Sequence, residues 1–218
     1  MKIVRAIDKH NVYAKWLQSE LYRVRESLTP TEITLIETPD LQNENDNAQR
    51  EDILLNKYGR SAILQRIPIN ITWHEIEIET ADTEQIYVCP VFDWFLDTGR
   101  TFKLSNTIEH LAPNRGWNFS LTNNGNVAHH QKITEMTASP QSYEDIVMIS
   151  TAITDKPFTI IDGTHRATFL HRNNNLTGTK GFLGIADNLS QCMWSVERAT
   201  FQNDLQELNQ IANDGKLW

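Results

Sequence analysis

Apolar positions near the start of the chain predict a short strand followed by a helix. Residues 1–6 are compatible with a first strand. Over residues 12–26 the apolar positions recur at three- and four-residue spacing, so that Trp16, Leu17 and Leu21 share one side of an amphipathic helix. Such a row of large side chains is typical of core packing rather than of a binding site.

The next segment contains a break and then three further predicted elements. Pro30 interrupts the helical pattern, and residues 32–37 alternate between apolar and polar side chains, which predicts a strand. Residues 40–46 are polar and acidic and predict a loop. Residues 49–64 have the spacing of a helix.

Residues 67–95 are rich in β-branched and aromatic side chains, which favour strands. Polar residues 81–84 divide this stretch in two and predict a hairpin. In the first half, alternation places Glu75, Glu77 and Glu79 on one face of a strand. Three carboxylates in a row are compatible either with a metal site or with a solvated face.

Turn-forming residues are concentrated between positions 97 and 126. An Asn-Gly pair within this stretch predicts a hairpin that joins residues 117–121 to residues 127–130. His129 and His130 would then point to opposite faces of a strand, so that one of them could enter an active site.

The second half of the chain contains two predicted helices and two short predicted strands besides its central motif. Ser139 can cap a helix over residues 140–153. Residues 181–185 and 193–196 are short apolar runs that predict strands, and residues 201–212 predict a terminal helix.

The segment TIIDGTHRATFL, residues 159–170, contains the strongest functional pattern of the sequence. A short apolar strand ends at Asp162, Gly163 permits a sharp turn, and helix-compatible residues follow. This arrangement places Thr164, His165 and Arg166 at a helix N-terminus, where unpaired N–H groups and the helix dipole favour an anion. A plain Asp-Gly turn before a solvated helix explains the same residues without any function.

The run IIDGTHRATFL resembles the D-G-x-H-R motif of the ParB/sulfiredoxin-like superfamily, over roughly residues 139–197. The superfamily includes sulfiredoxin, the nucleotide-binding domain of ParB partition proteins and kinases of free serine. The resemblance implies an α+β fold, a mixed sheet with helices, in which Gly163, Thr164, His165 and Arg166 bind nucleotide phosphates. We expect one domain of 218 residues, with a β-rich N-terminal elaboration over residues 1–124 and the motif-bearing region over residues 125–218.

Composition excludes some of the activities known in this superfamily. Sulfiredoxin chemistry needs a cysteine within the motif, where this chain has Thr164. The only cysteines, Cys89 and Cys192, lack metal-binding spacing and are expected to be buried, reduced thiols. The net charge of −8, from 28 acidic and 20 basic residues, disfavours nucleic acid as a partner. No apolar run approaches the roughly 20 residues that span a membrane, and no secretory signal begins the chain, so we expect a cytoplasmic protein.

These observations predict a phosphotransferase, a kinase of a small hydroxyl-bearing metabolite that uses ATP or ADP, with Mg²⁺ held mainly through the nucleotide phosphates. Asp162 and His165 are the expected catalytic residues of the motif. A carboxylate must also position the acceptor hydroxyl. Glu144 is preferred over Glu135 because it would begin the helix that leads into the motif strand, although an exposed glutamate in a first helical turn is the commoner explanation of such a residue.

Two alternatives remain open at the level of sequence. A ParB-like nucleotide switch, DNA-associated protein or nuclease would use the same turn without phosphorylating a metabolite, and an interaction domain would not use it at all. Trp194 could stack on a nucleotide base or simply pack. Neither the oligomeric state nor the phosphate acceptor follows from the sequence.

Overall fold

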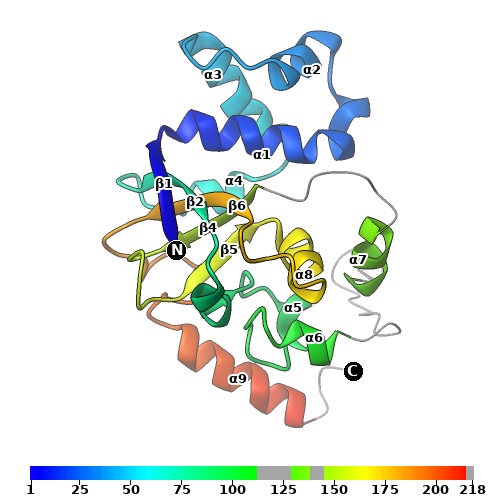
Figure 1. Ribbon diagram of the computed structural model, residues 1–218, viewed down its shortest axis with the longest axis vertical. Helices are drawn as coiled ribbons and strands as arrows, with labels where there is room; N and C mark the ends of the chain where they lie inside the picture. The colour runs from blue at the N-terminus through cyan, green and yellow to red at the C-terminus, as the bar shows by residue number, and fades with distance from the viewer. Residues whose placement is uncertain (112–128, 138–144, 215–218) are drawn as a thin grey trace.

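The computed structural model describes residues 1–111, 129–137 and 145–214, and these form an α+β fold. Six strands alternate irregularly with helices along the chain (Figure 1). The strands are β1 (Lys2–Ile7), β2 (Thr72–Glu77), β3 (Ile86–Tyr87), β4 (Ile146–Ser150), β5 (Phe158–Asp162) and β6 (Lys180–Ile185). The helices are α1 (Lys9–Val24), α2 (Pro30–Glu37), α3 (Glu44–Asp52), α4 (Ser61–Leu64), α5 (Phe92–Phe95), α6 (Thr107–His110), α7 (His129–Thr137), α8 (Thr164–Arg172) and α9 (Phe201–Asn213), with the short helical turns η1 (Arg25–Ser27), η2 (Ile53–Lys57) and η3 (Thr80–Gln85).

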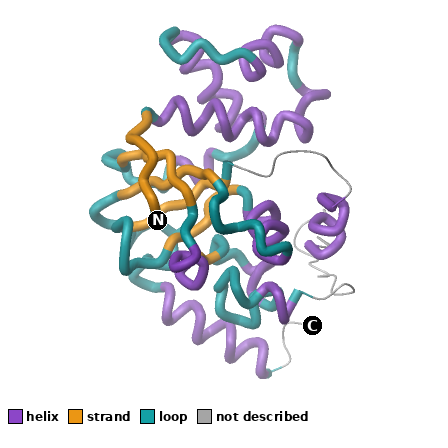
Figure 2. Tube along the Cα trace, viewed as in Figure 1, coloured by secondary structure: helices purple, strands orange, loops and turns teal. Residues whose placement is uncertain are grey.

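All six strands belong to one mixed sheet of order β1-β2-β6-β4-β5-β3. The strands β1, β2 and β6 pair antiparallel, β6 and β4 pair parallel, β4 and β5 pair antiparallel, and β5 and β3 pair parallel. The sheet therefore combines strands from both sides of residue 124. It lies at the centre of the molecule with helices on both faces (Figure 2).

Two hydrophobic cores cover the two faces of this sheet. Alternate residues of β4 belong to different cores. Val147 and Ile149 belong to the core that includes residues of α1 and α2, whereas Met148 belongs to the core that includes residues of α9. Figure 1 shows α1, α2 and α3 gathered on one side of the sheet and α9 on the other. Every residue of β4 and of β5 is buried, as expected for strands covered on both faces.

The structure confirms the strand, turn and helix predicted around the motif. It also confirms the first strand, the helix over residues 12–26, the strand over residues 181–185 and the terminal helix. Helical structure occupies most of residues 49–64, although it is divided among α3, η2 and α4.

Four predictions about single elements were wrong. Residues 32–37 lie in helix α2 because Thr29 and Glu32 form a reciprocal capping box and Pro30 occupies the first helical turn. The acidic loop is shorter than predicted, because α3 begins at Glu44 with Asn43 as its N-cap. Residues 193–196 form turns rather than a strand. The segment 146–150 is strand β4 and not part of a helix.

The predicted hairpin within residues 67–95 does not form. Its first half becomes β2, which pairs with β1 and β6, whereas Ile86 and Tyr87 form β3 at the opposite edge of the sheet beside β5. The aromatic run that follows contributes helix α5. Long-range pairing thus outweighs the local turn signal.

Other predictions fall partly outside the described residues. Residues 117–121 and the proposed N-cap Ser139 are among them. The described part of the second hairpin is not a strand, because His129 and His130 begin helix α7. Within the described ranges, no helix combines the length and the apolar character needed to cross a membrane.

Candidate functional site

The turn that follows β5 has the geometry that a phosphate-binding turn requires. Gly163 adopts φ = 85°, a left-handed conformation that side-chain-bearing residues rarely adopt. Helix α8 begins at the next residue, and its first intrahelical bond runs from the Ala167 N–H to the Gly163 carbonyl at 2.8 Å. The N–H groups of Thr164, His165 and Arg166 precede this bond and so have no acceptor within the helix. Glycine also has no side chain to cap them, and the first turn carries no acidic residue.

Arg166 folds back over this turn instead of extending into solvent. Its Nη2 donates to Asp162 Oδ2 at 2.8 Å and also approaches the Asp145 carbonyl at 3.4 Å. The guanidinium lies so close to Gly163 that an added Cβ would stand 3.0 Å from Nη2. A glycine at this position is therefore needed both for the backbone conformation and for the approach of Arg166.

A second arginine from the N-terminal half completes a buried ionic chain. Arg60 Nη2 donates to Asp162 Oδ1 at 2.9 Å and lies 3.8 Å from Glu20 Oε2 of α1. The two oxygens of Asp162 are therefore shared between two arginines, and its side chain is only 5% exposed. Sequence reasoning missed Arg60 and Glu20 because neither is near the motif in sequence, and only the fold brings them to it.

Burial raises the pKa of the Asp162 carboxyl from its ordinary value to about 6, and the nearby charge of Glu20 adds to this rise. The positive charges of Arg166 and Arg60 oppose it. At neutral pH the carboxyl is therefore ionised and balanced by the arginines. The nitrogen Nε of each of these arginines is buried without a hydrogen-bond partner among the described residues, so the protein itself does not satisfy all their donors.

The motif turn lies in a cleft of about 1100 Å³. One turn of α1, the end of β5, the start of α8 and part of α7 line it. The cleft contains four cationic side chains and four carboxylates, in contrast to the excess of acidic residues in the whole chain. These are Arg25, Arg60, Lys132 and Arg166, and Glu20, Glu135, Asp145 and Asp162.

Apolar and aromatic side chains form another part of the cleft wall. Ile63, Trp94 and Trp194 belong to it, and the indole N–H of Trp194 donates to the Ala62 carbonyl at 2.9 Å. Cys89 also lines the cleft, but burial raises the pKa of its thiol to about 12, so it is a protonated and poor nucleophile.

Three rings meet beside the motif histidine. The ring of Trp94 stacks on His129 with centroids 4.0 Å apart and meets the edge of His165 at 5.1 Å. His129 and Asp97 form a buried pair, with Nδ1 and Oδ2 at 3.0 Å and both side chains 2% exposed. The sequence indicated that one histidine of the pair 129–130 could enter the site, but gave no signal for Asp97 beyond a turn.

The structure brings the five predicted motif residues together at the cleft: Asp162, Gly163, Thr164, His165 and Arg166. Glu135 of α7 lines the same cleft and accepts a hydrogen bond from Gln131 at 2.8 Å. Glu144, the preferred catalytic carboxylate, lies outside the described residues. The helix on which that preference rested does not form over residues 146–150, so the preference loses its structural reason.

The row of glutamates on β2 and just beyond its end binds cations of the protein itself. Glu75 contacts Arg5 at 2.6 Å and Glu77 contacts Lys2 at 2.9 Å, while Glu79 lies 3.3 Å from the N-terminal amine. Throughout the described ranges, no three His, Cys, Asp or Glu side chains are grouped so that they could hold a metal ion. Magnesium at the motif would also meet the two guanidinium groups around Asp162. The residues present therefore fit Mg²⁺ only if nucleotide phosphates supply most of its ligands.

Comparisons of the chain with protein-family models, with curated proteins and with solved structures gave no match.

Proposed function

We propose that this protein is a nucleotide-dependent phosphotransferase, a kinase of a small hydroxyl-bearing metabolite in the cytoplasm, and that it resembles the ParB/sulfiredoxin-like superfamily in its use of the motif turn. The observation that carries the proposal is the position of this turn in the cleft. The N-terminus of α8, which has no side-chain cap, adjoins two arginines that share the Asp162 carboxylate there. N–H groups at a helix start and paired guanidiniums are the donors that bind phosphate oxygens most strongly.

In this proposal the backbone N–H groups of the first turn of α8 and the side chains of Thr164 and His165 hold the phosphates. Arg166 and Arg60 neutralise their charge, since each guanidinium has five N–H donors and Asp162 accepts only some of them. Asp162 then fixes the two arginines rather than binding a metal. Magnesium bound to the phosphates would offset charge during transfer.

The apolar part of the cleft supports the same class of ligand. Trp194 is anchored by its hydrogen bond to Ala62 and lies with Ile63 in the wall. A flat heteroaromatic base stacks well on an indole ring, whereas phosphate needs the charged end of the cleft. A cleft of about 1100 Å³ has room for both parts of a nucleotide and for an acceptor.

Calorimetric titration with ATP, ADP and CTP, each with magnesium, tests the proposal. We expect binding by the wild-type protein and its loss in Arg166→Ala and Arg60→Ala. Arg198→Ala is the matched control, because Arg198 also forms an ion pair with an aspartate, Asp204 at 2.8 Å, but lies outside the cleft. Circular dichroism establishes that each variant is folded. Absence of binding to all three nucleotides would refute the proposal.

Phosphorus NMR separates a kinase from the alternative functions. Transfer of phosphate from bound nucleotide to a hydroxyl compound supports the kinase. Nucleotide binding without any transfer would instead favour a ParB-like nucleotide switch, for which a salt-dependent gel shift with DNA is the next measurement.

A further inference from the structure

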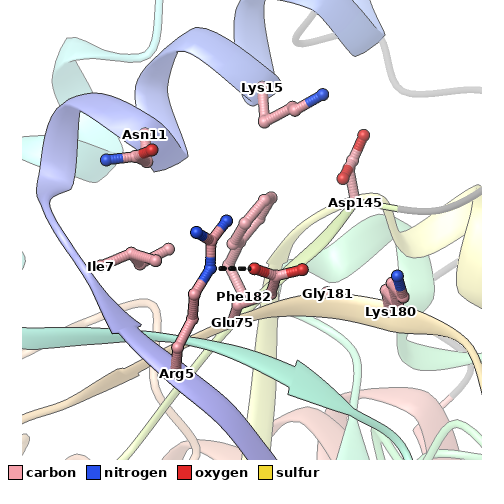
Figure 3. Close-up of a pocket in the computed structure, with 9 residues that line it drawn as sticks. All are labelled: Arg5, Ile7, Asn11, Lys15, Glu75, Asp145, Lys180, Gly181 and Phe182. Carbon is pink, nitrogen blue, oxygen red and sulfur yellow. Dashed lines mark hydrogen bonds and ion pairs between the residues drawn. The ribbon is translucent and has the colours of Figure 1, made fainter. Parts of the chain in front are cut away.

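A second, smaller pocket lies beside the proposed nucleotide cleft. It has a volume of about 220 Å³ and is formed between α1 and the sheet. Figure 3 shows Arg5 on β1 and Glu75 on β2, with Lys15 on α1 above them. Asp145 and Lys180 lie at the right of the view. None of the groups assigned to nucleotide binding lines this pocket.

The pocket has unbalanced positive charge. Arg5 contacts Glu75 through Nε at 2.6 Å, which leaves its terminal nitrogens outside this contact. No carboxylate of the described residues lies within 4 Å of the ammonium groups of Lys15 and Lys180. Three cations therefore face two carboxylates, Glu75 and Asp145. Such a site favours a small anion over a neutral or cationic ligand.

Asp145 connects this pocket to the nucleotide cleft, because it lines both. Its backbone has φ = 71°, and its carbonyl lies 3.4 Å from Arg166 Nη2. Helix α1 also borders both cavities, since Lys15 lines the small pocket and Gln18 and Tyr22 line the cleft. These three positions follow one another at three- and four-residue spacing and so lie along one side of α1.

We infer that the small pocket binds the phosphate acceptor, a hydroxyl-bearing organic anion, and that Asp145 is the carboxylate that receives the hydroxyl proton. This inference rests on the proposed kinase function. Lys15, Lys180 and Arg5 hold the carboxylate or phosphate group of the acceptor, and its hydroxyl points to Asp145. The volume of the pocket equals that of about seven waters at ~30 Å³ each, which suits an acceptor of three or four carbons.

The transfer step then follows from the positions of these groups. The acceptor oxygen attacks the terminal phosphorus of the nucleotide while its proton passes to an Asp145 carboxylate oxygen. The bond between this phosphorus and the bridging oxygen breaks, and the nucleotide shortened by one phosphate leaves with the electron pair. Asp145 thus takes the role that the sequence assigned to Glu144 or Glu135.

Three probes of matched carbon skeleton test the binding part without any nucleotide: glycerol, glycerate and glycerol 3-phosphate. In calorimetric titrations we expect glycerate or glycerol 3-phosphate to bind and glycerol not to bind, and the stronger of the two anions identifies the group that the pocket prefers. Lys15→Ala should weaken the binding of that anion by about fivefold. The control Lys156→Ala removes an exposed lysine outside both cavities and should leave affinity unchanged. Failure of both anions to bind, or equal binding of glycerol, overturns the inference.

Turnover measurements test the role of Asp145 as the group that receives the hydroxyl proton. Asp145→Asn keeps a residue that tolerates the left-handed backbone, so the fold should persist. Because the substitution removes a negative charge from the pocket, we expect the variant to bind nucleotide and anion at least as tightly as wild type. The substitution should lower kcat for phosphorylation of the bound anion by about a hundredfold, with loss of the acidic limb of the pH profile. Unchanged kcat overturns the role of Asp145. If no nucleotide binds at all, the proposed function fails instead, and the anion titrations still decide whether the small pocket is a binding site.

Discussion

Replacing Gly163 with alanine should lower the free energy of unfolding for two separate reasons, one in the backbone and one in the position of Arg166. At φ = 85° the new residue must adopt a left-handed conformation, which costs about 1–2 kcal/mol. Its Cβ would also stand 3.0 Å from Nη2 and 3.1 Å from Nε of Arg166. The guanidinium must therefore move away, and its 2.8 Å contact with Asp162 is lost or lengthened.

Gly178 provides a matched reference for this substitution. It has φ = 83°, and an added Cβ would meet nothing within 4 Å. Gly178→Ala thus measures the backbone cost alone. A hydrogen bond between charged groups contributes about 1.5–3 kcal/mol, so Gly163→Ala should be more destabilising than Gly178→Ala by roughly this amount. The total loss at Gly163 should reach about 2.5–5 kcal/mol.

Equilibrium unfolding in urea, followed by tryptophan fluorescence, measures both variants. Repeating Gly163→Ala in an Arg166→Ala background removes the displaced group, and the cost of the glycine substitution should then fall to that at Gly178. Equal destabilisation by Gly163→Ala and Gly178→Ala in the wild-type background would refute the idea that Arg166 is held against the turn.

Three further predictions concern buried groups. Because folding raises the pKa of Asp162 to about 6, the folded state keeps a proton that the unfolded state has lost between about pH 4 and 6, so this contribution to stability falls as pH rises through that window. Urea midpoints measured across this range should show a smaller decrease for Asp162→Asn than for wild type. Cys89 and Cys192 are buried with raised thiol pKa values, so a thiol reagent should modify both far more slowly in the folded than in the unfolded protein, and rapid native labelling would contradict this. His129→Phe keeps a ring on Trp94 but leaves Asp97 unpaired, so it should cost about 3–5 kcal/mol in urea unfolding, and adding Asp97→Asn should recover much of that loss.

The motif could be predicted from sequence because its structure is local. Strand, turn and helix in residues 158–172 each follow from neighbouring side chains, and Gly163 adopts the conformation that glycine tolerates best. The α+β class followed from the same segment and its resemblance. Arg60 and Glu20 could not be predicted, since they reach Asp162 only through tertiary structure.

The errors have a common physical origin in competition between local and distant interactions. Residues 146–150 have apolar positions compatible with helical spacing, yet they form a strand because all five are buried between two cores and paired to β5 and β6. Residues 32–37 alternate like a strand, but the cap formed by Thr29 and Glu32 begins a helix. Hydrophobic spacing alone does not distinguish these cases in short segments.

The order of strands in the sheet has a consequence for synthesis on the ribosome. Strand β2 lies between β1 and β6, and its residue Glu75 pairs with Phe182, which is made 107 residues later. At the usual rate of about 5–20 residues per second, β2 waits roughly 5–20 s for this neighbour. During that interval the emerging chain presents an unpaired strand edge, on which Trp73 and Ile76 still lack their packing partners. Chaperone dependence during translation should therefore be greatest before β6 leaves the exit tunnel.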